Sequence, residues 1–342
     1  MIKVSVIVPV YKVPLEYLRG CLESLAAQTL QECEFLIVSD GAPEAECAIC
    51  DEYTTKDTRF KFFKREHAGV SATRNYGIKQ AQGEYTTFVD ADDWVEQNAL
   101  DLVYKYAQSN NSDLIFWDLF FEENTNNSDY TNFHTNNIPL LSPEQITFFQ
   151  KSIIHAYQRK YLIPALTVCK LIKTNVIKTN NIFFDTNLVH GEDRVFNYRI
   201  TQHLLKFSYL QKRLYHYRLH NSSTENSFHE KNFPHFIEFI TSLNNISNNA
   251  YPQHIADETI TCFLRSIYKT YQHNLSTKQR FQELLFLKQQ IHKAPFHLFI
   301  QNATYTGRRR TEQIDIFLMK RRLSLFLTLR VIKARIIYFL HL

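Results

Sequence analysis

The sequence places three aspartates within four residues, a spacing that can bind a metal ion. Asp90, Asp92 and Asp93 directly follow the apolar run 84–89. Their negative charges repel one another, and a cation among them would offset that cost. Carboxylates at a strand end are typical ligands of Mg²⁺ or Mn²⁺, which also bind the phosphates of a substrate. Capping of a helix that begins near Trp94 would explain the same residues, so both interpretations stay open.

Three further features could belong to the same site. Asp40 precedes Gly41, where the backbone can approach a ligand closely, although an ordinary turn aspartate has the same pattern. Arg74 adds a cation on a predicted helix, where a solvated surface charge is the alternative. Glu192 and Asp193 are adjacent carboxylates. At a helix N-terminus such a pair would interact favourably with the helix dipole without taking part in any chemistry.

Short strands that alternate with helices must position these side chains. We expect strands at 2–10, 34–38, 60–64 and 84–89, and helices at 15–28, 44–53 and 70–82. This alternation predicts an α/β fold with a mostly parallel sheet and helices on both faces. Ligands of such sheets lie beyond the carboxyl ends of the strands, and three of these strands end at Tyr11, Asp40 and Asp90.

Charge is distributed unevenly along the chain. Its 342 residues include 39 Lys and Arg and 34 Asp and Glu, but 231–342 alone holds 16 basic and 6 acidic residues. A hydrophobic content of 44% excludes wholesale disorder, and six cysteines in so long a chain do not resemble the disulfide framework of a small secreted domain. We find no signal peptide and no apolar stretch long enough to span a bilayer, and therefore expect a cytoplasmic protein.

Several motifs resemble, in their order along the chain, those of glycosyltransferase family 2. The matching segments are VSVIVPVYK, VSDGAPE, GVSATRNYGIKQAQGEYTTFVDADDW, GEDRVFN and LYHYRLHNSST. Members of this family are inverting enzymes of the GT-A fold, a Rossmann-like nucleotide-binding sheet, and they use nucleotide-diphospho-sugars. The resemblance covers about two thirds of the chain. It implies a nucleotide-sugar-binding part at 1–125, an acceptor-binding part at 126–230 and a basic, mainly helical C-terminal region at 231–342.

The resemblance also implies which residues bind the donor. The nucleotide-sugar ligands would be Pro9, Tyr11, Asp40, Arg74, Asp90, Ala91 and Asp92. A Mn²⁺ or Mg²⁺ ion would be bound by Asp92, Asp93 and His220. The family commonly has Asp-Asp-Gly-Ser where this chain has Ser39-Asp40-Gly41-Ala42, which leaves open whether the base is uracil.

For the reaction, the resemblance implies that Asp193 is the general base and that Glu192 orients Asp193 or the acceptor. The base would take the proton of the acceptor hydroxyl as that hydroxyl attacks the anomeric carbon. Two other functions remain possible on this fold. A sugar nucleotidyltransferase should have a Gly-rich phosphate loop after the first strand, where this chain has Pro9 to Lys12. A binding or scaffold protein that has lost catalysis would be expected to lack Asp92 or Asp193, and both are present.

The basic C-terminal region bears on location and partners. A lipid-linked acceptor, such as a growing lipopolysaccharide, lipooligosaccharide or capsule glycan, would make attachment to an anionic membrane useful. Packing of a solvated helix on the catalytic domain is the alternative. We expect a cytoplasmic protein that is peripheral on the inner face of the plasma membrane. Nucleic acid is not an expected partner, because the rest of the chain is net acidic.

Overall fold

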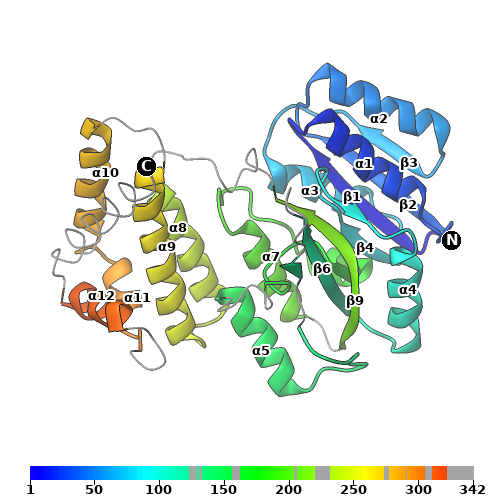
Figure 1. Ribbon diagram of the computed structural model, residues 1–342. Helices are drawn as coiled ribbons and strands as arrows, with labels where there is room; N and C mark the ends of the chain where they lie inside the picture. The colour runs from blue at the N-terminus through cyan, green and yellow to red at the C-terminus, as the bar shows by residue number, and fades with distance from the viewer. Residues whose placement is uncertain are drawn as a thin grey trace. The chain divides into compact units, whose positions relative to one another are not determined.

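The computed structural model describes residues 1–122, 129–130, 133–155, 162–203, 206–219, 232–272, 277–290, 292–304 and 310–321. The chain forms two compact units (Figure 1). The first, here called the sheet unit, comprises Met1–Asn187 and Glu192–Ser223. The second, the helical unit, comprises Leu188–Gly191 and Thr224–Leu342.

One half of the sheet is parallel, as the alternating pattern predicts. It consists of β1 (Val4–Val10), β2 (Cys33–Ser39), β3 (Phe60–Phe63) and β4 (Tyr85–Phe88), in the order β3-β2-β1-β4. The intervening helices are α1 (Leu15–Ala26), α2 (Glu44–Lys56) and α3 (Val70–Gln80). All seven residues of β2 are buried, as expected for a strand covered on both faces. The carboxyl ends of β1, β2 and β4 therefore meet at one edge of the sheet.

The other half of the sheet mixes strand directions. From β4 the order continues through β8 (Lys170–Lys173), β6 (Leu114–Glu122), β9 (Phe207–Arg218) and β5 (Trp94–Val95), while β7 (Asp129–Tyr130) pairs with β6. Only β6 and β9 are parallel to each other among these pairs of described strands. The helices of this half are α4 (Ala99–Ser109), α5 (Pro143–Ile154), α6 (Thr174–Thr179) and α7 (Glu192–Thr201).

Helix α3 packs directly against β1 at one glycine. A Cβ atom added at Gly77 would lie 2.5 Å from Cγ2 of Ile7 on β1. Real Cβ atoms do not approach other carbons so closely, so this contact requires glycine. The helix is thereby held against β1, and Arg74, one turn earlier, reaches the edge where β4 ends.

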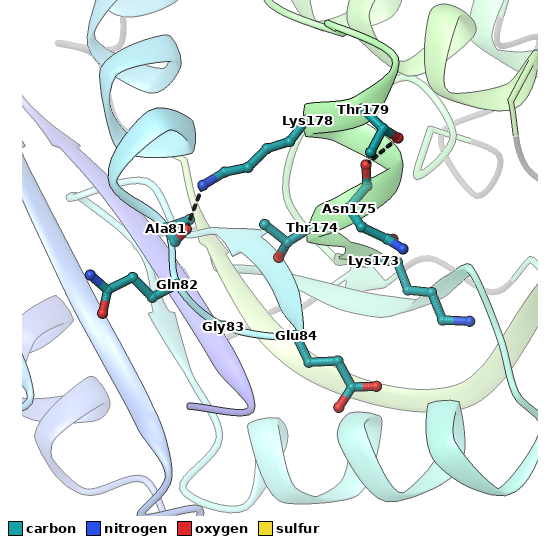
Figure 2. Close-up of a pocket in the computed structure, with 9 residues that line it drawn as sticks. All are labelled: Ala81, Gln82, Gly83, Glu84, Lys173, Thr174, Asn175, Lys178 and Thr179. Carbon is teal, nitrogen blue, oxygen red and sulfur yellow. Dashed lines mark hydrogen bonds between the residues drawn. The ribbon is translucent and has the colours of Figure 1, made fainter. Parts of the chain in front are cut away.

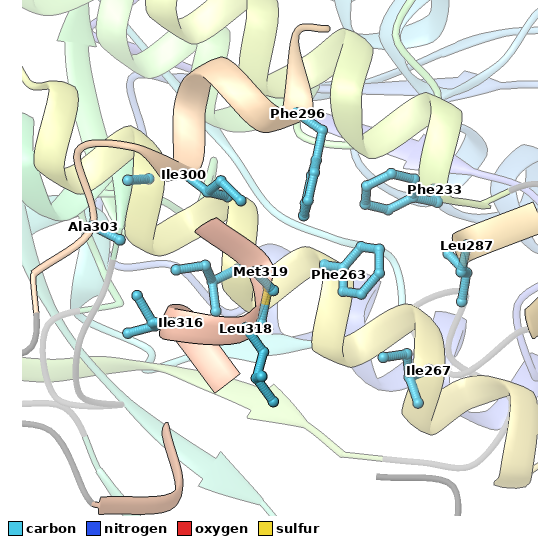
Figure 3. Packing of buried hydrophobic residues seen from close by; sticks show 12 residues of the cluster. Phe233, Phe263, Ile267, Leu287, Phe296, Ile300, Ala303, Ile316, Leu318 and Met319 are labelled. Carbon is cyan, nitrogen blue, oxygen red and sulfur yellow. The ribbon is translucent and has the colours of Figure 1, made fainter. Parts of the chain in front are cut away.

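The helical unit has a core of its own. It contains α8 (Asn232–Ile246), α9 (Pro252–Gln272), α10 (Thr277–Gln290), α11 (Phe296–Ile300) and α12 (Arg310–Lys320). Phe233, Phe263 and Phe296 pack together at its centre, and Ile316 and Met319 of α12 belong to the same cluster (Figure 3). None of the helices formed by the described residues is both long and apolar enough to cross a membrane.

Candidate functional site

The three aspartates after β4 have different environments. Asp90 and Asp92 are partly exposed, whereas Asp93 is only 2% exposed. The hydroxyl of Tyr215 donates to Oδ2 of Asp93 at 2.6 Å, and the backbone N–H of Arg218 donates to Oδ1 at 2.8 Å. Burial raises the pKa of Asp93 well above its usual range, and the charges of Asp92 and Asp90 raise it further. Asp93 therefore binds the loop 90–93, here called the acidic loop, to β9.

This arrangement limits how a metal ion could bind. Within the described parts of the chain, no group of three or more His, Cys, Asp or Glu side chains is placed to hold a metal ion. His220 lies outside the described residues. Mg²⁺ is often bound by one or two carboxylates together with the phosphates of a substrate. Asp92 is partly exposed and could contribute one such carboxylate, whereas both oxygens of Asp93 accept hydrogen bonds from β9.

Arg74 joins two parts of the site that are far apart in the sequence. Its Nη1 donates to Oδ1 of Asp193 at 2.7 Å and its Nη2 donates to Oδ1 of Asp90 at 3.0 Å. Oε1 of Glu192 lies 3.8 Å from the same Nη1. Burial alone would lower the pKa of Arg74, but the charges of Asp193, Asp90 and Glu192 raise it above its usual value. The guanidinium is therefore a permanent cation among three carboxylates.

The carboxylate pair begins helix α7, as one of the two sequence interpretations has it. Glu192 and Asp193 occupy the first turn, where the helix dipole favours negative charge. Burial raises the pKa of Glu192 to about 7, the charge of Asp193 contributes in the same direction, and Arg74 opposes both. A carboxyl group with such a pKa can exchange a proton near neutral pH, which is useful in acid–base chemistry.

Asp40 organises the loop in front of α3. Its Oδ1 accepts hydrogen bonds from the backbone N–H groups of Ala68 at 2.7 Å and Gly69 at 3.1 Å. Nδ1 of His67 lies 3.0 Å from Oδ2. The ring of His67 in turn stacks on Tyr11, with centroids 4.5 Å apart and an angle of 19° between the rings. Tyr11, which follows β1, and His67, in the loop between β3 and α3, thus form an exposed aromatic pair that a flat base could contact.

Pro9 and Ala91 complete the placement of the predicted donor ligands. Pro9 lies near the end of β1, partly exposed, opposite Val38 of β2. Ala91 is buried in the acidic loop. Among the residues that the structure describes, the predicted site residues thus lie at the carboxyl ends of β1, β2 and β4, on the neighbouring α3 and at the start of α7.

The sequence interpretation missed several residues that build this site. Asn75 makes two hydrogen bonds to the backbone of Phe184, accepting from its N–H at 2.8 Å and donating to its carbonyl at 2.9 Å. The ring of Phe184 lies 5.4 Å from the guanidinium carbon of Arg74. Tyr215 and His67 were missed as well. The only available signal was their position beside or inside the quoted motifs, because their partners are distant in the sequence.

A hollow at the other end of β4 is not part of this site (Figure 2). It lies between the 81–84 loop, which precedes β4, and α6. Lys178 donates to the carbonyl of Ala81 at 2.7 Å, and Lys173 pairs with Asp113 at 3.1 Å. Both lysines of the hollow therefore already have partners within the fold.

Comparison with known proteins identifies the family. The sequence profile described as "Glycosyl transferase family 2" matches residues 5–167. An uncharacterized glycosyltransferase of Methanocaldococcus jannaschii, MJ1057, is 30% identical over 222 residues, which cover 64% of this chain and 71% of that protein. This chain belongs to glycosyltransferase family 2. The resemblance read from its motifs is confirmed.

Two other comparisons bear on this family 2 chain. GlyA, a glycosyltransferase of Streptococcus pneumoniae, is 30% identical over 257 residues, which cover 74% of this chain but only 36% of GlyA. The chain thus spans about a third of the length of that relative. The crystal structure of Staphylococcus aureus TarS 1–349 in complex with UDP-GlcNAc superposes with a TM-score of 0.68 at 19% identity, covering 94% of this chain and 88% of that one. This likeness confirms the expected GT-A fold.

Proposed function

We propose that this family 2 chain is an inverting glycosyltransferase that moves a sugar from a nucleotide-diphospho-sugar, with UDP as the nucleotide, to an acceptor hydroxyl. The observation that carries this proposal is the cluster of Asp90, Arg74 and Asp193. It places a candidate general base beside the loop that would bind the donor. The UDP-GlcNAc bound in the TarS crystal structure supports the choice of nucleotide.

The donor would occupy the carboxyl edge of the sheet. Its base would contact the Tyr11–His67 pair beside Asp40, and its ribose and diphosphate would lie near Asp90 and Asp92. A Mn²⁺ or Mg²⁺ ion bound by Asp92 and the diphosphate would neutralise the charge that develops on the leaving group. Asp93 would contribute indirectly, by fastening the loop to β9.

Asp193 would act on the acceptor. An inverting displacement needs a carboxylate that removes the proton of the acceptor hydroxyl while its oxygen attacks the anomeric carbon from the face opposite the leaving group. The side chain of Asp193 is 28% exposed, so an acceptor can reach it. Glu192, which precedes it on α7, would help to orient the acceptor.

The acceptor class and the location follow from the basic helical region. We propose a growing surface glycan, such as lipopolysaccharide, lipooligosaccharide or capsule, as acceptor. The excess of ten basic residues within 231–342 supports peripheral attachment to an anionic membrane, on the inner face of the plasma membrane.

Binding and transfer can be tested separately. Nucleotide sugars, among them UDP-GlcNAc, UDP-glucose and UDP-galactose, would be screened by thermal shift with and without Mn²⁺. A donor should raise the melting temperature, because a ligand at 100 times its Kd stabilises the folded state by about 2.7 kcal/mol. Asp92→Ala should remove the Mn²⁺-dependent part of that shift. Asp193→Asn should keep the shift and abolish transfer of the sugar to an acceptor.

Three outcomes would contradict the proposal. If no nucleotide sugar raises the melting temperature, the chain does not bind such donors. Binding without transfer to any glycan acceptor would favour the sugar-nucleotide-binding protein that has lost catalysis. Full turnover by Asp193→Asn would show that another group is the base.

A further inference from the structure

The position of Arg74 is not explained by a contact with the nucleotide alone. Its side chain is only 6% exposed, whereas those of Asp90 and Asp193, which it pairs with, are 29% and 28% exposed. The cation therefore lies beneath two carboxylates that ligands can reach. Little of its own surface is offered to a donor.

We propose that Arg74 is a positioning residue, which holds the side chain of Asp193 in the orientation needed to accept the acceptor proton and fixes it relative to the donor-side Asp90. This inference rests on the proposed function of Asp193 as the base. Nη1 donates to Asp193 at 2.7 Å and Nη2 donates to Asp90 at 3.0 Å. The planar guanidinium therefore sets the spacing between the two carboxylates. The donor role predicted from the sequence is a separate property of the same residue.

The guanidinium is itself held by rigid surroundings. Helix α3 cannot move away from β1 without opening the contact between Gly77 and Ile7. The neighbouring Asn75 ties α3 to the backbone of Phe184, and the ring of Phe184 stacks on Phe196 of α7 with centroids 4.0 Å apart. The contacts of Phe184 thus connect α3 and α7 a second time, in addition to the ion pair between Arg74 and Asp193. Catalytic groups need support of this kind to stay in productive geometry.

The charges explain why the cation is needed there. Glu192 and Asp193 are consecutive carboxylates, and Asp90 adds a third to the same small volume. Without a cation these groups would repel one another, and Asp193 would turn toward solvent. Nε of Arg74 is buried without a hydrogen-bond partner, a cost that the two strong ion pairs must offset. Lysine would supply the charge but not the fork that reaches both carboxylates.

A double-mutant cycle on the full chain tests the pairing without any assay of activity. Urea unfolding would be measured for Arg74→Met, Asp193→Asn, the double variant and the wild type. We expect Arg74→Met to lower the urea midpoint, and Asp193→Asn to recover part of that loss in the Arg74→Met background, because it removes an unpaired charge. Lys79→Met, which removes an exposed cation from the same helix, is the matched control. Additive effects of Arg74→Met and Asp193→Asn would overturn the proposal.

The pH dependence of turnover separates positioning from a purely structural role. The ionisable groups around Arg74 are Asp90, Glu192 and Asp193, with Lys170 also interacting with Asp193. A nearby cation shifts the titration of a carboxyl group by about 1 to 3 pH units. We therefore expect the acidic limb of the kcat profile to move to higher pH in Arg74→Met, and by less in Arg74→Lys, which retains the charge.

Binding of UDP, measured by calorimetry, completes the test. For a positioning residue, kcat at saturating donor falls at least tenfold in Arg74→Met, whether or not the Kd of UDP also rises through loss of the predicted donor contact. Weaker UDP binding with an unmoved pH profile would make Arg74 a nucleotide ligand alone and overturn the inference. Because the double-mutant cycle needs no turnover, a failure of the proposed glycosyltransferase activity would be recognised separately.

Discussion

Glu192 connects the charge of the site to the stability of the fold. Burial holds its pKa at about 7 in the folded protein, against 4.5 for an ordinary glutamate. Between these two pH values the unfolded chain has lost the proton and the folded chain has kept it. The contribution of Glu192 to the free energy of unfolding is therefore fully present below about pH 4.5, and it is lost as the pH rises to about 7.

Glu192→Gln should remove this pH dependence. The neutral amide resembles the protonated carboxyl, so the variant should gain stability relative to the wild type between pH 4.5 and 7. The upper limit is about 3.5 kcal/mol, since each of the roughly 2.5 pKa units corresponds to about 1.4 kcal/mol. Urea unfolding at several pH values measures the difference. Glu44→Gln, at an exposed first-turn position of α2, is the control, and a Glu192→Gln curve parallel to that of the wild type would refute the prediction.

Single residues also show what the sequence could predict. The aspartates after β2 and β4 are adjacent to buried strands, so local pattern sufficed to place Asp40 and Asp90 at one edge of the sheet. The pairing of Arg74 with Asp193 spans 119 residues and depends on how α7 packs. The bonds that Asp93 makes to β9 are equally nonlocal. Residue type and spacing could not distinguish Asp93 from Asp92.

At the scale of elements, the contact between α3 and β1 holds Arg74 in place beside Asp90 and Asp193. Gly77→Ala should destabilise the protein by about 1 to 3 kcal/mol, because the new methyl group meets Ile7 in a packed core. Gly20→Ala is the matched control, since Gly20 lies within α1 and nothing is within 4 Å of its added Cβ. That substitution should stabilise the protein by about 0.5 to 1 kcal/mol. Urea unfolding of both variants measures the two changes. Equal changes in the free energy of unfolding would contradict the prediction that Gly77 is needed for the contact between α3 and β1.

The elements themselves were unequally predictable. The strands expected at 2–10, 34–38, 60–64 and 84–89 are present as β1 to β4, because each is a short apolar run bounded by turn residues. The strand directions and pairings in the second half of the sheet were not predicted. There β8 runs antiparallel between β4 and β6, and β5 contributes only two residues. Strand direction and such short pairings are set by distant partners, which hydrophobic periodicity does not reveal.

On the scale of the whole molecule, the helical unit decides how the proposed membrane attachment should be tested. Ile316, Leu318 and Met319 of α12 belong to its buried core, and Ala303 lies in the same cluster. A truncation before α12 would therefore expose apolar surface and confuse unfolding with release from a membrane. A chain that ends after Arg321 keeps all the described residues of this core.

We expect the full chain to bind vesicles that contain anionic lipid, and the chain ending at Arg321 to bind them far more weakly. The truncation removes four basic residues, Arg322, Arg330, Lys333 and Arg335, together with many apolar ones. At about 1 kcal/mol for each basic residue near the surface, the loss approaches a thousandfold in affinity. Cosedimentation with vesicles of 30% phosphatidylglycerol measures it. Neutral vesicles and a salt series are the controls, because electrostatic attraction weakens as the Debye length shortens. Equal binding by the two chains would show that the basic residues pack within the protein and do not attach it to a membrane.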